Sequence, residues 1–135
     1  MTFTPSNFLR RVLQLDAVAT GATGLLLLGG TSILHGLLNL PVSLMTYAGV
    51  FCVAWAVVIG AASFRPQLSR SFVWSIIAGN VLWVIGSVAL LVSGYVSPTW
   101  LGYAFVIAQA LAVDIFAGLQ MFAMWKLNRN ASKAV

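Results

Sequence analysis

The sequence predicts an all-α membrane protein, an antiparallel bundle of four transmembrane helices that forms one domain over residues 1–135. The first reason is composition, because 61% of the residues are hydrophobic and 7% are charged, whereas a soluble domain carries about 25% charged residues. The second is that the apolar residues form four runs long enough to cross a hydrocarbon layer of about 30 Å. The third is that every Lys and Arg flanks one of these runs.

The first two spans are expected on either side of a short amphipathic segment. The first covers about residues 8–29 and the second about 41–64, which ends before Arg65-Pro66. Pro41 is acceptable in the first helical turn, where its missing N–H does no harm. The intervening stretch, 32–38, is too short to cross a bilayer and predicts an interfacial helix between spans 1 and 2.

The last two spans are expected at about residues 71–94 and 99–126, followed by a polar tail at 127–135. Between these spans, Ser97 is the expected helix cap and Pro98 the first helical residue. The spans thus alternate with short connections, as an antiparallel bundle requires.

The basic residues predict the orientation of this bundle. They lie at the N-terminus, between the second and third spans, and in the tail: Arg10, Arg11, Arg65, Arg70, Lys126, Arg129 and Lys133. The two other connections contain none, so the positive-inside rule places both termini in the cytoplasm. Because the basic residues form no stripe, the net charge of +5 indicates topology, and no nucleic-acid partner is expected.

Asp114 is the most costly residue of the fourth span. At about 1.5 Å per residue it lies roughly 18 Å from Lys126, near the middle of the hydrocarbon layer. An acid at that depth costs on the order of 2.5–3.5 kcal/mol on insertion scales. Asp114 is therefore expected to face protein, water or a partner rather than lipid.

The other polar residues of the spans fall at matching depths, as groups that need hydrogen bonds in hydrocarbon should. Depth alone predicts a buried polar network of three pairs: Asn80 donating to Asp114, Gln120 meeting Asp16, and Ser87 meeting Gln109. The central pair has three interpretations. They are a protonated Asp114 bonded to Asn80, a proton or cation site, and a contact to another subunit.

Several aromatic residues point toward the same interior and form a possible ligand lining: Trp55, Trp83, Phe105 and Phe116. Ordinary core packing is the alternative interpretation. Cys52 and His35 are each the only residue of their type, so neither an internal disulfide nor a two-histidine haem or metal site can form within one chain. No Ser/His/Asp arrangement or phosphate-binding loop is present. The sequence therefore predicts no catalytic residues, no metal, no cofactor and no enzymatic activity.

Short motifs along most of the chain carry a resemblance to a known group of proteins. They are Leu15-Asp16-Ala17 with Gly21 and Gly24, the N-x-L-W run from Asn80 to Trp83, Pro98-Thr99 with Gly102, Gln109-Ala110, and Ala117 with Leu119-Gln120. With these motifs the chain resembles an uncharacterised family of small four-span bacterial inner-membrane proteins, and it resembles DoxX-type four-helix proteins in architecture alone. The resemblance implies the fold and a bacterial inner membrane, and it implies no activity.

Three functions remain open on this basis. The first is a structural or accessory subunit without a catalytic site, which works as a homo-oligomer or within a larger membrane complex. The second is a small proton-coupled transporter or channel that uses the membrane-buried Asp114, with Asp16 as the less favoured acid. The third is a protein that binds a lipid or another small hydrophobic ligand.

Overall fold

The computed structural model describes residues 1–133 and contains four long helices and one short helix. The long helices are α1 (Asn7–Gly29), α3 (Val42–Ser63), α4 (Arg70–Val92) and α5 (Trp100–Lys133). Each is long and apolar enough to cross a membrane, which confirms the prediction of an all-α, four-span membrane protein. The short helix α2 (Thr31–Leu38) lies between the first two spans, where a short helix was expected.

Small polar residues set the helix boundaries. The side chain of Ser6 accepts a hydrogen bond of 3.1 Å from the backbone N–H of Leu9, so Ser6 caps the N-terminus of α1. Asn39 ends α2 in the left-handed conformation, with φ of 53°, which Asn adopts more readily than most residues. α1 therefore begins, and α2 ends, at a residue suited to the change of direction.

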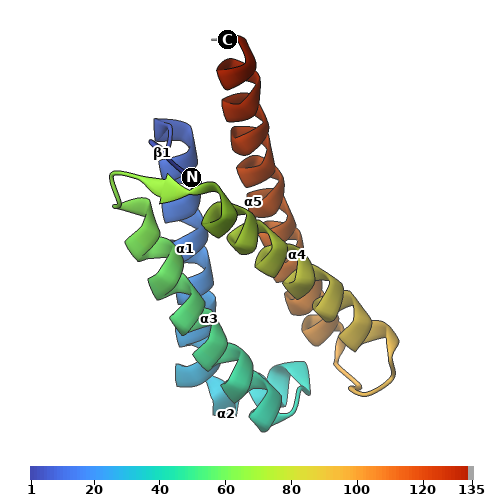
Figure 1. Ribbon diagram of the computed structural model, residues 1–135. Helices are drawn as coiled ribbons and strands as arrows, with labels where there is room; N and C mark the ends of the chain where they lie inside the picture. The colour runs from blue at the N-terminus through green and yellow to red at the C-terminus, as the bar shows by residue number, and fades with distance from the viewer. Residues whose placement is uncertain (134–135) are drawn as a thin grey trace.

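The four spans form two closely packed pairs, α1 with α3 and α4 with α5 (Figure 1). In the first pair the backbones approach at Gly24, where an added Cβ would lie 2.8 Å from the carbonyl oxygen of Gly49. The pairs meet mainly through α1 and α5, and α2 packs against the start of α5. By contrast, α3 and α4 diverge as they leave the connection that joins them (Figure 1).

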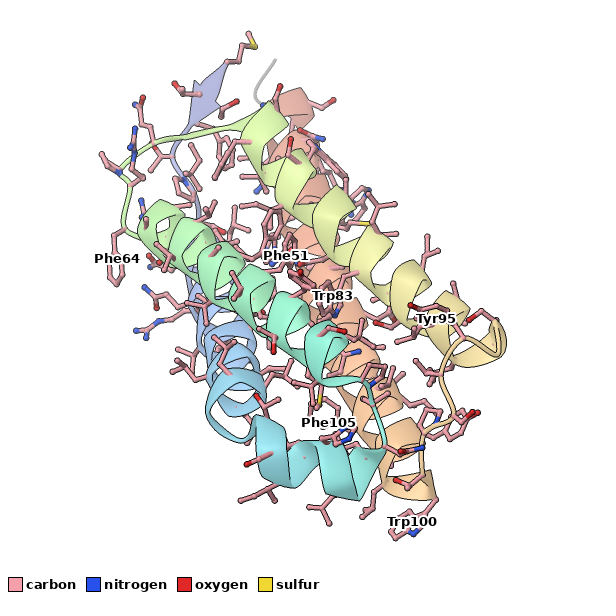
Figure 2. All side chains as sticks on the ribbon, turned by 90° about the horizontal axis from the view of Figure 1, so that it is seen from below. Phe51, Phe64, Trp83, Tyr95, Trp100 and Phe105 are labelled. Carbon is pink, nitrogen blue, oxygen red and sulfur yellow. The ribbon has the colours of Figure 1, made fainter. Side chains whose placement is uncertain are left out.

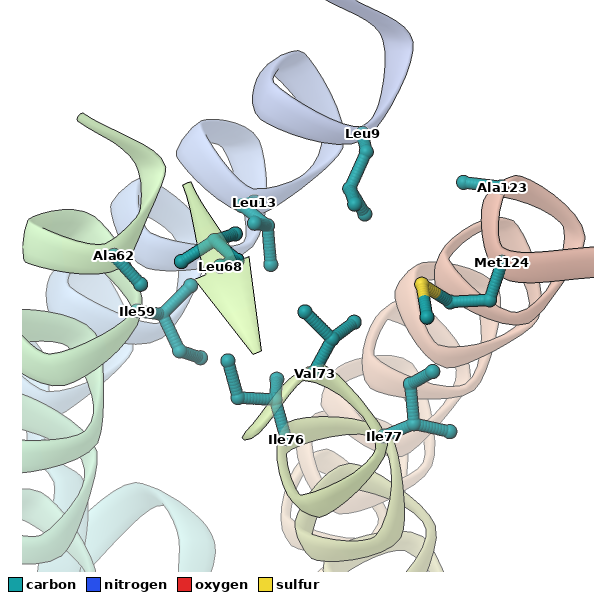
Figure 3. Packing of buried hydrophobic residues seen from close by; sticks show 10 residues of the cluster. All are labelled: Leu9, Leu13, Ile59, Ala62, Leu68, Val73, Ile76, Ile77, Ala123 and Met124. Carbon is teal, nitrogen blue, oxygen red and sulfur yellow. The ribbon is translucent and has the colours of Figure 1, made fainter. Parts of the chain in front are cut away.

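The apolar core is divided into two clusters at opposite ends of the spans. The first gathers around α1, α4 and the second half of α5, as Figure 3 shows: Leu9, Leu13, Ile59, Ala62, Leu68, Val73, Ile76, Ile77, Ala123 and Met124. The second lies at the end that holds α2: Leu27, Leu38, Leu40, Met45, Val96 and Val106. Four buried polar residues fall between these two clusters along their helices, namely Asp16, Asn80, Ser87 and Gln120, whereas buried Ser63 lies at the end of α3 beside the first cluster.

One end of the bundle, called here the basic end, holds the N-terminus, the connection at 64–69 and the last turns of α5 (Figure 1). There, β1 (Thr2–Phe3) pairs antiparallel with β2 (Leu68–Ser69), a contact that the sequence did not predict. Arg10 donates hydrogen bonds to the backbone carbonyl oxygens of Ser63 at 2.9 Å and Arg65 at 2.7 Å. These bonds satisfy carbonyls that the end of α3 leaves free.

The polar segment after residue 126 was expected as a tail, and the structure continues it as helix to Lys133. α5 is therefore roughly 50 Å long at about 1.5 Å per residue, longer than the hydrocarbon layer. Its last turns extend past the other helices at the basic end (Figure 1). Residues 134–135 of the expected tail lie outside the described residues.

Candidate functional site

Asp16 is the centre of a buried polar network that joins all four spans. Its side chain is 0% exposed. Its Oδ2 accepts hydrogen bonds from Asn80 Nδ2 at 2.9 Å and from Gln120 Nε2 at 2.7 Å, and its Oδ1 accepts one from Thr20 Oγ1 at 3.1 Å. All three donors are neutral, so hydrogen bonds alone replace the water that the carboxyl group loses on burial.

Trp55 fixes the orientation of both side-chain amides in this network, those of Asn80 and Gln120. The indole Nε1–H can only donate, and it donates to Asn80 Oδ1 at 3.1 Å. The amide nitrogen of Asn80 must then face Asp16 and Gln120, and it also donates to Gln120 Oε1 at 3.1 Å. With its oxygen so used, Gln120 turns its own Nε2 to Asp16. The amide orientations therefore follow from one donor that has no alternative form.

A second polar cluster lies further from the basic end than the first. It likewise contains a tryptophan N–H that donates to a side-chain amide oxygen. Trp83 Nε1 donates to Gln109 Oε1 at 2.7 Å, and Gln109 Nε2 donates to Ser87 Oγ at 3.0 Å. The same Nε2 also donates to the carbonyl oxygen of Val106 at 2.8 Å, and Ser87 Oγ donates to the carbonyl oxygen of Trp83 at 2.8 Å. The oxygen and both N–H groups of the Gln109 amide therefore have partners inside the protein.

The predicted pair of Asn80 and Asp114 is absent, and that prediction is wrong. Asn80 bonds Asp16 and Gln120 instead, while Asp114 is exposed on the outer side of α5. The prediction paired Asn80 and Asp114 because they lie at similar depths in the membrane, and it did not consider how α5 is rotated about its own axis. Gln109 and Gln120 are eleven residues apart, about three turns, and so share the inner face of α5. Asp114 lies roughly 140° around the helix from Gln109 and faces away.

The two other predicted pairs are present, since Gln120 bonds Asp16 and Gln109 bonds Ser87. The hydrogen-bonding roles of Trp55 and Trp83 were missed, because both residues were interpreted only as aromatic surface. A usable signal existed, since a buried indole N–H requires an acceptor and one Asn and one Gln lie at suitable depths.

An aromatic stack connects the two polar clusters. The ring of Phe51 lies nearly parallel to Trp55, with centroids 5.8 Å apart and planes at 15°, and nearly parallel to Trp83 at 5.4 Å and 5°. Each tryptophan thus donates its N–H to a side-chain amide and stacks its ring on Phe51. Figure 2 shows Phe51 and Trp83 side by side between α3 and α4. The sequence analysis did not single out Phe51.

A groove with a volume of about 590 Å³ lies between α3 and α4, on the side of the stack away from the basic end. Its walls are mostly apolar and include Leu44, Phe51, Leu82, Trp83 and Phe105. Tyr47 and Leu82 at its edge are 77% and 67% exposed, so the groove opens sideways from the bundle. In a membrane this opening faces the acyl chains of lipids.

A smaller cavity of about 50 Å³ adjoins the groove, because Phe51, Trp83 and Gln109 line both. The four aromatic residues predicted as ligand lining are divided between these cavities. Trp55 and Phe116 line the small cavity, Phe105 lines the groove, and Trp83 lies between them. The polar network and the aromatic residues therefore form one continuous site in the middle of the bundle.

Comparison with known protein families, with curated proteins and with solved structures gives no match to this chain. The molecule therefore stands as a small four-span membrane protein whose site must be interpreted from its own chemistry.

Proposed function

We propose that this protein binds the apolar chain of a lipid, or a hydrophobic molecule of similar shape, in the groove between α3 and α4. The observation that carries the proposal is the groove itself, whose volume of about 590 Å³ falls within the range of about 300–1,000 Å³ typical of ligand pockets. Its apolar and aromatic walls match a ligand that dissolves in the hydrocarbon layer.

The polar atoms beside the groove support an apolar ligand rather than a polar one. The oxygen and both N–H groups of Gln109 are already bonded within the protein, and Ser87 Oγ both donates and accepts. Within residues 1–133, every buried side-chain nitrogen and oxygen has a hydrogen-bond partner. A polar ligand group would therefore meet no unpartnered buried nitrogen or oxygen there, whereas a methylene chain needs none.

The groove also gives such a ligand a route of access. Because the opening lies between two spans, a lipid chain can move into the groove from the bilayer without crossing water. Phe51 is 48% exposed and lines the groove. The closely packed pairs α1/α3 and α4/α5 form the two fixed walls.

The test is to fill the groove without disturbing the core. An added Cβ at Gly86 meets no atom within 4 Å, and Gly86 lines the groove, so Gly86→Phe is expected to fold normally and to occupy the space. Ala78→Phe is the matched control, because Ala78 is exposed on the same helix and lines neither the groove nor the small cavity.

Native mass spectrometry of protein extracted in mild detergent measures the bound lipid. The proposal predicts a retained lipid on the unaltered protein and on Ala78→Phe, and at least a tenfold loss of it from Gly86→Phe. Equal retention by both variants would contradict it.

We also propose the orientation that the basic residues indicate, with both termini in the cytoplasm, and the bacterial inner membrane that the family resemblance implies. The support is that all seven Lys and Arg residues belong to the basic end, in segments that the antiparallel fold brings together (Figure 1). Membrane-impermeant thiol labelling of single added cysteines tests this. A cysteine at Gln67 should react only from the cytoplasmic side and one at Tyr95 only from the outside; the reverse pattern would contradict the orientation.

Proton-coupled transport is a second candidate function, and the geometry favours Asp16 over Asp114 as its acid. Asp16 is fully buried, and its partners Thr20 and Asn80 line the small cavity, whose volume of about 50 Å³ exceeds the 10–15 Å³ that one water requires. Water there would connect Asp16 to the groove. This function predicts that Asp16→Asn abolishes pH-driven flux in proteoliposomes while the protein still folds; flux that survives the substitution rules the acid out.

A further inference from the structure

Asp114 places a carboxyl group on the outer surface of a membrane span, which is rare in membrane proteins. It lies roughly 18 Å from Lys126 at about 1.5 Å per residue, which corresponds to the middle of a hydrocarbon layer of about 30 Å, and its side chain is exposed on the outer side of α5. Among residues 1–133, no donor bonds its carboxyl group. The neighbouring surface is a shallow hollow of about 210 Å³ between α4 and α5, and its walls are otherwise almost entirely apolar. Lipid chains cannot hydrogen-bond a carboxyl group, so a polar partner from outside the chain is needed.

The residues around Asp114 form a continuous seam along α5. They repeat at alternating intervals of four and three residues, all are exposed, and they are Ile107, Leu111, Asp114, Gly118, Met121 and Trp125. This interval keeps one helix face turned toward a parallel neighbouring helix in a left-handed pair. We call these six residues the α5 seam.

We infer that the α5 seam binds the same seam of a second copy of this chain, with the two Asp114 side chains meeting at the centre. A two-fold axis along the membrane normal brings each residue on the axis to its own copy. The second copy therefore supplies a polar group at the depth of Asp114 without any further requirement on sequence. Two carboxyl groups that hold at least one proton form an O–H···O hydrogen bond, which replaces the partner that lipid cannot provide.

The rest of the seam fits a helix pair of this kind. All copies in one membrane share an orientation, so the two α5 helices run parallel. An added Cβ at Gly118 meets no atom within 4 Å, so this residue leaves a flat surface where two helices can approach closely. The hollow beside Asp114, walled by Val84, Val88 and Leu111, can take side chains from the partner.

Disulfide crosslinking in native membranes tests the seam at the level of single residues. In a Cys52→Ala background, Gly118→Cys is expected to crosslink two chains, because residue 118 lies on the seam. Leu119→Cys is the matched control, since this exposed neighbour lies roughly 100° around the helix. Crosslinking at 118 and little at 119 supports the inference. No crosslinking at 118, or equal crosslinking at both positions, overturns it, as does an oligomer that proves to contain a foreign chain on this face.

The role of Asp114 requires a second measurement, the dissociation constant of the dimer in detergent micelles. Asp114→Asn retains a group that both donates and accepts, so the constant is expected to change by less than about threefold. Asp114→Leu removes the bond, and the constant is expected to rise roughly five- to thirtyfold. Unchanged or tighter association of Asp114→Leu would show that the carboxyl group does not hold the copies together. Because the groove between α3 and α4 is not part of this face, failure here leaves the proposed lipid binding intact.

Discussion

At the scale of single residues, the orientation of the side-chain amides in the site depends on groups that can only donate a hydrogen bond. Two tryptophans supply N–H groups without an alternative, and each fixes an amide that would otherwise be free to turn. As a result Asp16 receives two N–H donors on one oxygen and a hydroxyl on the other. This arrangement makes Asn80 the residue on which the network depends most, since it bonds Trp55, Asp16 and Gln120 together.

Replacing Asn80 by Leu is therefore expected to destabilise the fold by about 1–3 kcal/mol, the cost of leaving buried polar groups without partners. The side chain of Trp55 would lose its acceptor and Asp16 one of its donors. Reversible unfolding in mixed micelles measures the difference in free energy. Ser75→Ala is the control on the same helix, because Ser75 is exposed and bonds only the Ser71 carbonyl of its own helix. If both variants unfold alike, the network contributes no net stability.

At the scale of helices, small residues decide which spans pack closely. Gly24 and Gly49 bring α1 against α3, and Gly79 leaves room for the ring of Trp55, to which an added Cβ would come within 2.7 Å. Gly86, only seven residues from Gly79 on α4, faces open space instead. α4 is therefore closely packed at Gly79, where the Trp55 ring fills the space, and borders an open groove at Gly86, where no side chain does.

Gly24→Ala is expected to cost about 1–3 kcal/mol of stability, because its Cβ would lie within 2.9 Å of the backbone at Gly49 and Val53, which cannot move aside. Gly86→Ala introduces the same methyl group in open space and should leave the unfolding free energy unchanged or slightly higher. The comparison uses the same unfolding assay. A Gly24→Ala protein as stable as Gly86→Ala would contradict the close approach of α1 and α3.

The sequence predicts the helices well and their rotation poorly. Run length, prolines and basic residues locate the first three spans and the start of the fourth to within a few residues, because lipid requires long apolar helices, whereas α5 continues to Lys133, past its predicted end at 126. Depth then pairs Gln120 with Asp16 and Gln109 with Ser87 correctly, and it pairs Asn80 with Asp114 wrongly. Which face of α5 turns inward depends on packing between helices, and an apolar helix in lipid shows little contrast between its faces. The spacing of Gln109 and Gln120 carried that information.

The separation of α3 and α4 likewise could not be predicted from the sequence. The short connections led us to expect a simple antiparallel bundle, whereas α3 packs most extensively against α1 and α4 against α5. The strand pair at the basic end and the hydrogen bonds of Arg10 to the end of α3 hold the connection in place. These contacts join residues more than fifty positions apart, which local patterns do not reveal.

At the scale of the whole molecule, the bundle has an inner site and an outer face that serve different purposes. The groove between α3 and α4 is apolar, open to the side and backed by a polar network in which each buried side-chain nitrogen and oxygen of the described residues has a hydrogen-bond partner. The α5 seam lies on a different helix and places its one carboxyl group outside. A dimer formed through α5 would leave both grooves accessible to lipid, so ligand binding and self-association are compatible in one assembly.

The most direct measurement of the central claim is a structure of the protein determined in a lipid phase rather than in detergent alone. The account predicts continuous, elongated density for an apolar chain in the groove, from the opening beside Tyr47 to the ring faces of Phe51 and Trp83. A structure in which α3 closes onto α4 and Leu82 and Phe51 fill the space, with no ligand density, would contradict it.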